Sequence, residues 1–314
     1  MAAIVTEALT KYYGTTPGIV DLDIEVHVGE VFGFLGPNGA GKSTTIRTLL
    51  HMLHPTSGTG SILGLDIGKD SVDIRKRIGY IPGDLAMYND MTAQQLFEYF
   101  SSLRHADTRL MVEELAGRLQ LDVTKKIGSY SSGNRQKVAI VQAFMAEPEL
   151  LILDEPSGGL DPLMQQEFYR MVDEVKSEGR TVFLSSHILP EVERLADRVG
   201  IVRESRLVAL ETVAALREKA MRRLEIIFSH PVDVSDFASL PGVHRTEGTH
   251  NGRGVDLTVE GNLDRVMAVA GRHPIENIRS RQGDLEEAFL AYYADDGVPL
   301  GTGGTDRSVP DDVP

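Results

Sequence analysis

The chain has 314 residues, of which 41% are hydrophobic and 25% charged, with a formal net charge of −14 and no cysteine. This composition is typical of a soluble globular protein, and it excludes disulfides, thiol catalysis and cysteine-ligated metal sites. It also argues against nucleic acid as a partner, because contacts to phosphate backbones need clustered Lys and Arg side chains. No apolar run approaches the roughly 18–20 residues that span a bilayer, and the N-terminus lacks a secretory signal pattern, so we expect a cytoplasmic protein.

The N-terminal part of the chain alternates short apolar segments with segments of helical periodicity, which predicts an α/β domain with a largely parallel core sheet. The expected strands are VFGFLG (31–36), RIGYIP (77–82), LLILDE (150–155) and RTVFLSSH (180–187). Residues 84–145 instead carry apolar positions at helical spacing with no strand between them. We interpret this segment as a mostly helical insertion into the α/β core.

A second, smaller α+β domain is predicted over residues 222–293, where the order β-α-β-β-α-β resembles a ferredoxin-like unit. Asn251 and Gly252 form a dipeptide favoured in tight hairpin turns. Asn262 can cap a helix that has Met267 on its apolar face. The unit shows no catalytic cluster, so packing or assembly is the expected role.

The C-terminal end of the chain carries two further expectations. Residues 284–293, DLEEAFLAYY, have the apolar spacing of an amphipathic closing helix. Residues 295–314 are rich in Gly, Pro and Asp, and such a segment buries too little apolar surface to offset its ordering entropy. We therefore expect a disordered acidic tail.

The segment GPNGAGKST follows a predicted strand, precedes a predicted helix, and matches the pattern G-x-x-x-x-G-K-[ST]. Glycines let the backbone wrap a phosphate closely, and the amides at the helix start can form an anion-binding nest. In this pattern Lys42 reaches the β- and γ-phosphates, Ser43 binds Mg²⁺, and Thr44 adds a contact to the α-phosphate. The alternative is a chance glycine-rich turn. The pattern predicts a P-loop NTPase core that binds ATP through Gly36, Pro37, Asn38, Gly39, Ala40, Gly41, Lys42, Ser43 and Thr44.

Three further side chains at predicted strand ends are candidates for catalysis and metal binding. Asp154 lies where a P-loop NTPase places the acid that holds Mg²⁺, and Glu155 can polarise an attacking water. His187 ends the next apolar strand, from which it can donate a hydrogen bond to the γ-phosphate. Together with Lys42, these residues form the expected catalytic group. The alternatives are turn-forming acids and a structural histidine.

The segment YSSGNRQ (130–136) offers a second small-residue turn at the start of a helix, which is a second anion-binding end without a ligand of its own. The helical insertion should carry this turn away from its own phosphate loop. A head-to-tail homodimer, in which each chain closes the ATP of the other, would use both ends. The alternative is a plain serine-rich helix cap. The residues expected to contact the partner's ATP are Tyr130, Ser131, Ser132, Gly133 and Asn134.

The phosphate loop, YSSGN, LLILDEPSGGLD and SSH occur in an order and spacing that resemble the ATP-binding cassette ATPases over residues 1–215. With the trailing NRQK, the chain looks most like the daunorubicin-resistance type of bacterial exporter ATPase, including a small C-terminal domain that extends to about residue 293. By this resemblance YSSGN is the signature segment, Tyr13 would stack on adenine, and Asp161 would connect the two ATP sites. A buried core tyrosine is the alternative for Tyr13.

One position departs from the family. Its members usually carry Gln or Glu directly after the strand RIGYIP, where that side chain touches Mg²⁺ and senses the membrane partner. Gly83 occupies this position here, followed by Asp84. We expect either that Asp84 substitutes through a water molecule or that the contact is absent and coupling runs through the helical insertion.

The resemblance implies an ATPase subunit of a membrane transporter and favours an exporter of drugs, lipids or other amphiphiles. It implies a homodimer on the inner face of the cell membrane, docked on integral-membrane permease subunits encoded separately. An amphipathic surface of the insertion, including LFEYFSSL (96–103), would accept short cytoplasmic helices of these subunits, and a solvent-facing or core-packing role for this segment is the alternative. An importer subunit, an ion-export subunit and a soluble ATPase of cofactor assembly remain alternatives. The residues determine neither the cargo nor the direction of transport.

Overall fold

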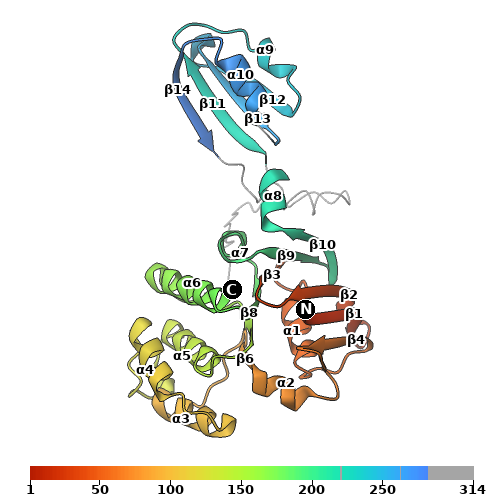
Figure 1. The fold of residues 1–314 in the computed structure, drawn as a ribbon, viewed down its shortest axis with the longest axis vertical. Helices are drawn as coiled ribbons and strands as arrows, with labels where there is room; N and C mark the ends of the chain where they lie inside the picture. The colour runs from red at the N-terminus through yellow and green to blue at the C-terminus, as the bar shows by residue number, and fades with distance from the viewer. Residues whose placement is uncertain (220, 262, 282–314) are drawn as a thin grey trace, which may run out of the picture. The chain divides into compact units, whose positions relative to one another are not determined.

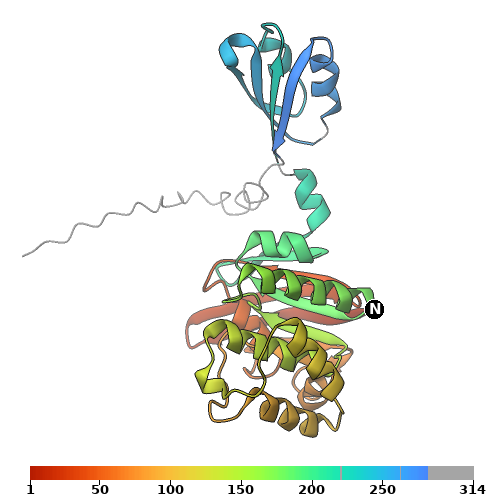
Figure 2. The same ribbon diagram turned by 90° about the vertical axis from the view of Figure 1, so that its left-hand side faces the viewer.

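The computed structural model describes residues 1–219, 221–261 and 263–281, and Figures 1 and 2 show its ribbon from two directions. The chain divides into two compact units, Met1–Lys219 and Ala220–Pro314. The predicted cap Asn262, the predicted closing helix at 284–293 and the predicted tail at 295–314 lie outside the described residues. Within the described ranges, no helix combines the length and the apolar character needed to cross a membrane.

A six-stranded sheet forms the centre of the first unit, in the order β10-β9-β3-β8-β7-β6. Its strands are β3 (Val31–Leu35), β6 (Ile78–Ile81), β7 (Leu150–Asp154), β8 (Thr181–Ser186), β9 (Arg198–Arg203) and β10 (Arg206–Thr212). Neighbouring strands are parallel, except that β10 runs antiparallel to β9. The four predicted strands are confirmed as β3, β6, β7 and β8, whereas β9 and β10 are not among the predicted strands.

These central strands are apolar along their length because both faces of the sheet are covered. Successive side chains of β7 point to opposite faces. Leu151 and Leu153 therefore pack in the core on one face, while Leu150 and Ile152 pack in the core on the other.

A second, antiparallel sheet has the order β2-β1-β4-β5. It consists of β1 (Ala2–Tyr13), β2 (Thr16–His27), β4 (Ser57–Ile62) and β5 (Leu65–Asp66). The pairing of β1 with β2 contains several register shifts. Buried and exposed residues alternate along β2 from Asp21 to His27, although β2 is not among the strands predicted from the sequence.

The predicted insertion at 84–145 is helical, and Figure 1 shows its helices gathered on one side of the central sheet. It contains α3 (Ala93–Arg104), α4 (Arg109–Arg118), the 3₁₀ turn η1 (Ile127–Ser129) and α5 (Ser132–Phe144). Thr92 and Gln95 form a reciprocal capping box that begins α3. The other helices of the first unit are α1 (Lys42–Leu49), α2 (Ser71–Arg77), α6 (Pro162–Ser177), α7 (Leu189–Leu195) and α8 (Val213–Lys219).

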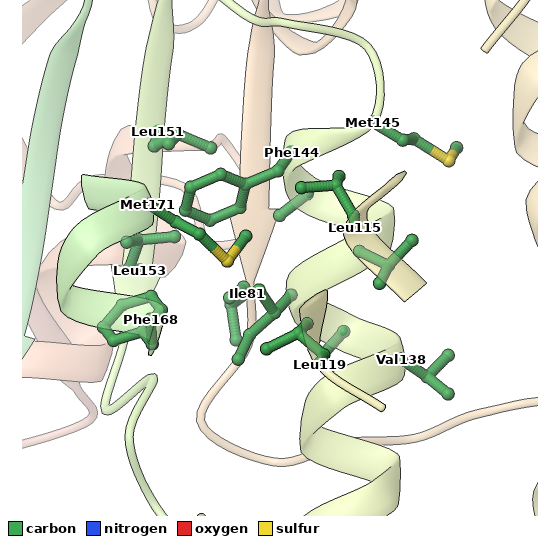
Figure 3. Packing of buried hydrophobic residues seen from close by; sticks show 14 of the residues in the cluster. Ile81, Leu115, Leu119, Val138, Phe144, Met145, Leu151, Leu153, Phe168 and Met171 are labelled. Atoms are coloured by element: carbon green, nitrogen blue, oxygen red, sulfur yellow. The ribbon is translucent and has the colours of Figure 1, made fainter. Parts of the chain in front are cut away.

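The core on the insertion side joins β6, β7 and β8 to helices α4, α5 and α6 (Figure 3). Phe144 of α5 and Phe168 of α6 pack edge to face, with ring centroids 6.3 Å apart. Leu115 and Leu119 of α4 join the same cluster. This cluster fixes α5, and with it the segment YSSGN at its start, relative to the central sheet.

The second unit has the predicted order β-α-β-β-α-β, and its antiparallel sheet has the strand order β12-β13-β11-β14. Its elements are β11 (Arg222–Phe228), α9 (Ser235–Ala238), β12 (Val243–Thr249), the 3₁₀ turn η2 (His250–Gly252), β13 (Gly254–Val259), α10 (Asp264–Ala270) and β14 (Ile275–Arg281). The chain reverses at Asn251, which has a left-handed φ of 55°. Met267, predicted on the apolar face of α10, is instead 37% exposed.

Phe168→Ala tests the core on the insertion side. The ring is 0% exposed, so its removal should lower the free energy of unfolding of the first unit by about 3–5 kcal/mol through lost contacts and a residual cavity. Leu163→Ala on the same helix is the control, because Leu163 is 77% exposed and its loss should change stability by about 0.5 kcal/mol or less. Urea titration followed by circular dichroism measures both. Equal effects of the two substitutions would contradict this packing.

Candidate nucleotide-binding and catalytic site

The predicted phosphate loop connects the end of β3 to the start of α1, where the first backbone amides of a helix have no partner within the helix. A Cβ atom at Gly41 would lie 2.2 Å from the carbonyl oxygen of Gly18, and one at Gly36 would lie 2.4 Å from that of Val202. Gly41 also has a left-handed φ of 105°. Both glycines are therefore required by close backbone packing, which leaves the amides at the start of α1 available to an anion.

Three of the side chains predicted for catalysis meet beside this loop. The Nζ atom of Lys42 lies 3.4 Å from Oε1 of Glu155, and Nδ1 of His187 lies 3.2 Å from the same oxygen. Lys42 is buried and also donates hydrogen bonds to the carbonyl oxygens of Gly36 and Pro37, at 2.8 and 3.1 Å. One carboxylate oxygen thus contacts a cation and an imidazole, an arrangement that can accept a proton from a bound water.

The register of the central sheet explains why these side chains meet. Leu35 of β3 pairs with Ser186 of β8, and Asp154 of β7 pairs with Ser185, so the carboxyl ends of the three strands are level. The amide of Glu155 donates to the carbonyl oxygen of Ser185 at 3.1 Å. Glu155 itself has a left-handed φ of 50°, which is uncommon for a residue with a side chain and turns the chain at the end of β7.

Asp154 is 1% exposed and offers one carboxylate oxygen to a cation. The hydroxyl of Ser185 donates to Oδ1, whereas Oδ2 is buried and has no hydrogen-bond partner among the described residues. A buried carboxylate is costly unless a charge or donor balances it. Carboxylate and hydroxyl oxygens, here those of Asp154 and Ser43, are the donors that Mg²⁺ prefers. These residues therefore fit a divalent cation.

Gly83 leaves space beside this oxygen. A Cβ atom at this position would lie 2.9 Å from Oδ2 of Asp154, closer than a carbon atom can normally approach. With any larger residue at position 83 the Asp154 carboxylate would have to shift, and Gly83 leaves it where it is. Asp84 is exposed, and its side chain makes no hydrogen bond or ion pair with any residue in the described part of the chain.

The segment YSSGN lies at the start of α5 and packs against the loop that follows Glu155. The Ser131 hydroxyl caps α5 by accepting from the amide of Asn134 at 3.3 Å. A Cβ atom at Gly133 would lie 2.6 Å from the carbonyl oxygen of Gly159. Tyr130 is buried, and its hydroxyl donates to the carbonyl oxygen of Asp122. Ser131 and Ser132 remain exposed at the surface.

Comparison with known proteins identifies the family. The ABC transporter family matches residues 19–158. The bacitracin transport ATP-binding protein BcrA of Bacillus licheniformis is 38% identical over 229 residues, which cover 72% of this chain and 75% of BcrA. The chain belongs to the ABC transporter family.

Two further similarities extend this result. The daunorubicin resistance ATP-binding protein DrrA3 of Streptomyces coeruleorubidus is 32% identical over 307 residues, which cover 94% of this chain and 96% of DrrA3. A solved structure of an ATP-binding subunit of an ABC transporter superposes with a TM-score of 0.65 at 30% identity, covering 68% of this chain and 92% of that chain. The resemblance and the P-loop NTPase fold are confirmed, and the protein is an ATPase whose hydrolysis of ATP is coupled to transport.

Tyr13 lies beside the phosphate loop of this ABC ATPase. Its ring is 47% exposed, which excludes the alternative of a buried core tyrosine. Its hydroxyl lies 3.3 Å from Oγ1 of Thr44, and Nζ of Lys11 lies 5.8 Å from its ring centroid. The side chain thus presents an aromatic surface next to the loop.

Asp161 has a structural contact in this ABC ATPase. Its Oδ1 atom accepts hydrogen bonds from the amides of Leu163 and Met164, at 3.1 and 3.0 Å, and so caps α6. The predicted contact between the two ATP sites would have to coexist with this cap.

Gln136, Ser185 and Glu191 are not among the site residues predicted from the sequence. Gln136 is buried, and its side-chain amide donates to the carbonyl oxygen of Pro156 at 2.6 Å, so α5 is bonded to the residue directly after Glu155. Ser185 contacts Asp154 because β7 and β8 are neighbours, which the spacing of the motifs does not reveal. For Gln136, its place within the segment YSSGNRQ is the one signal in the sequence that could have identified it as a site residue.

A cavity of about 970 Å³ lies elsewhere, lined by α3, α4 and the segment that follows α4. None of the predicted catalytic, nucleotide-binding or metal-binding residues lines it, whereas Phe97, Glu98 and Ser101 of the predicted docking segment LFEYFSSL do.

Proposed function

We propose that this protein is the motor subunit of an exporter of drugs, lipids or other amphiphiles. It hydrolyses MgATP as a homodimer on separately encoded integral-membrane permease subunits, at the cytoplasmic face of the membrane. The observation that carries this proposal is the contact of Lys42, Glu155 and His187 beside a phosphate loop. The similarity to a bacitracin transport protein and to a daunorubicin resistance protein favours an exporter over an importer or a cofactor-assembly ATPase.

The contacts on Glu155 suggest how its side chain acts. Glu155 accepts a proton from the water that attacks the γ-phosphate, and His187, in contact with the same carboxylate, donates a hydrogen bond to that phosphate. Lys42 exchanges the carbonyl oxygens of Gly36 and Pro37 for phosphate oxygens when the nucleotide binds. Tyr13 stacks on the adenine ring, and the amides of the phosphate loop hold the phosphates.

Mg²⁺ would be held by Ser43 and Asp154, with Asp84 acting through water. The support is the buried, partnerless Oδ2 of Asp154 and the space that Gly83 leaves beside it. When bound, the ion neutralises charge on the phosphate oxygens. Asp84 is placed to help because it follows Gly83 and its carboxylate has no competing partner in the described residues.

The second half of each ATP site would come from the partner chain. Ser131 and Ser132 are exposed at the start of α5, where helix amides and serine hydroxyls can receive phosphate oxygens. No hydrogen bond or ion pair among the described residues joins 130–134 to the phosphate loop of the same chain. A twofold axis would make the contact reciprocal and give two sites, with Asp161 between them.

The permease would dock where apolar side chains gather beside the loop that contains Gly83. Tyr88 and Tyr99 are exposed and pack edge to face with centroids 6.2 Å apart, and Leu103 is exposed on the same helix as Tyr99. A cavity of about 200 Å³ beside them is lined by Tyr80 and Phe100, among others.

The occupant we assign to this surface is a short amphipathic cytoplasmic helix of the permease, because exposed aromatic and aliphatic side chains beside a cavity suit helix-in-groove binding. Burial and the neighbouring Asp154 carboxylate raise the pKa of Tyr80 to about 12, so its hydroxyl stays protonated between the cavity and the metal-binding acid.

The division into residues 1–215, 222–293 and 295–314 stays a prediction, with the second part as a packing or assembly module.

Glu155→Gln tests the motor assignment and the shared site together. The variant should bind ATP, form a dimer with MgATP, and turn over about 10²–10⁴ times more slowly, because the base is lost and nucleotide contacts remain. The double variant Glu155→Gln, Ser131→Arg should remain monomeric with ATP still bound. The control double variant Glu155→Gln, Ser129→Arg, which is changed at an exposed position two residues earlier, should still form the dimer. Sedimentation velocity and a turnover assay measure these outcomes. Normal turnover would remove Glu155 as the base, and equal dimerisation of the Ser131→Arg and Ser129→Arg proteins would remove the shared site.

Gly83→Ala and Asp84→Ala test the metal site. Both should raise the Mg²⁺ concentration needed for half-maximal turnover and weaken binding of Mn²⁺ with nucleotide, as measured by electron paramagnetic resonance. The first places a methyl group against Oδ2 of Asp154, and the second removes a water-mediated ligand. Asp90→Ala, an exposed acid of the same loop, is the control. If Asp84→Ala changes neither ATPase rate, metal dependence nor partner-stimulated turnover, its assigned role is wrong.

Co-purification tests the docking surface. The tagged protein should recover a polytopic membrane protein from detergent-solubilised membranes, and a Tyr88→Ser, Tyr99→Ser variant should lose it because the apolar contact is removed. Leu110→Ser is the control, because Leu110 is 84% exposed but lies at the start of α4. Equal recovery by all three proteins would show that the permease binds elsewhere.

A further inference from the structure

Glu191 is a buried acid to which the proposed roles assign no task. It lies in the first turn of α7, the short helix that follows His187, and it is 2% exposed. Glutamates are almost never fully buried unless they are paired, because burial removes the water that stabilises their charge. A buried glutamate beside the proposed catalytic side chains therefore requires interactions that stabilise it there.

One oxygen of this carboxyl holds the turn that carries His187. The hydroxyl of Ser186 donates to Oε2 of Glu191 at 2.5 Å. The same hydroxyl oxygen accepts from the amide of Ile188 at 3.0 Å. Ser186, directly before His187, is thus bonded both to Ile188, directly after His187, and to Glu191.

The carboxyl also faces the segment that carries the base. The Ser157 hydroxyl, two residues after Glu155 and itself 3% exposed, faces the Glu191 carboxyl and favours its charged form. Oε1 of Glu191 has no hydrogen-bond partner among the described residues. The hydrogen bond that fixes this carboxyl is therefore the one from Ser186.

The helix that presents Glu191 is itself fixed. A Cβ atom at Gly33 of β3 would lie 2.5 Å from Cγ1 of Val192, so α7 packs directly on the backbone of the strand that leads into the phosphate loop. By contrast the side chains of Glu155 and His187 are 35% and 45% exposed. Their own packing does not hold them in place, and a buried neighbour on a fixed helix can.

The electrostatic surroundings agree with this geometry. Burial raises the pKa of Glu191, the Ser186 and Ser157 hydroxyls and His187 oppose the rise, and the Glu155 carboxylate adds to it. Tyr169 of α6 faces the same group, and its pKa is raised by burial and by Glu191. The charge on Glu191 thus responds to both members of the Glu155–His187 pair.

We propose that Glu191 is a positioning residue that, through Ser186, holds the turn that carries His187 and so maintains the contact between the side chains of His187 and Glu155. This inference rests on the catalytic roles proposed for Glu155 and His187. Glu191 touches neither nucleotide nor water in this role.

Substitutions of Glu191 in the full-length chain test this role. Glu191→Ala should lower kcat by about 10- to 100-fold while KM for ATP stays within about twofold, because misplacement affects the reaction more than binding. Glu191→Gln keeps the size and the acceptor for Ser186, so it should retain kcat within about threefold. Glu193→Ala on the same helix, whose carboxylate accepts from Arg217, is the control and should change kcat by less than about twofold.

Ser186→Ala removes the other end of the same hydrogen bond and remains informative if Glu191→Ala fails to fold. It should also lower kcat without changing KM, and the double variant should be no slower than the slower single variant. Unchanged kcat in Ser186→Ala, additive losses in the double variant, or a Glu191→Gln protein as slow as Glu191→Ala would each overturn the proposal. Glu155→Gln is assayed in parallel. If this variant turns over ATP normally, the proposed function fails. If Glu155→Gln is slow but Glu191→Ala is fully active, only the present inference is refuted.

Discussion

The parallel pairing of β3, β7 and β8 brings the carboxyl ends of these three strands to one edge of the central sheet, and the candidate site depends on this register. Leu35 lies level with Ser186, and Asp154 with Ser185. The phosphate loop, the Asp154–Glu155 pair and His187 follow directly after these positions. Because side chains alternate along a strand, a shift of one residue would point Asp154 to the other face of the sheet. In β7 and β8, alternate residues are buried in the two different apolar cores.

The segment that follows Glu155 is joined to helix α5. Gln136 of α5 donates to the carbonyl oxygen of Pro156, and Gly133 lies against Gly159. The start of α5 and the end of β7 are therefore connected through packed contacts and one buried hydrogen bond.

Burial also sets the chemistry of the two adjacent acids. Asp154 is buried with one oxygen bonded to Ser185 and the other without a partner, which suits a fixed cation ligand. Glu155 turns out of the strand with a left-handed φ and remains partly exposed beside Lys42 and His187, which suits a group that exchanges protons with water. Two neighbouring carboxylates thus differ in environment because the strand ends between them.

The sequence by itself determined the apolar central strands, the helical insertion, the order of the second unit and the ABC transporter family, because these follow from periodicity and from motifs that are contiguous in the chain. It did not lead to β1, which lacks a regular alternation of buried and exposed residues, or to β2, although Leu22, Ile24 and Val26 alternate there with exposed residues. Only the tertiary structure decided that Gly83 lies against Asp154 and that Gln136 bonds Pro156. Such contacts join residues distant in the chain, and they depend on strand order and on the packing of helices, which local spacing does not encode.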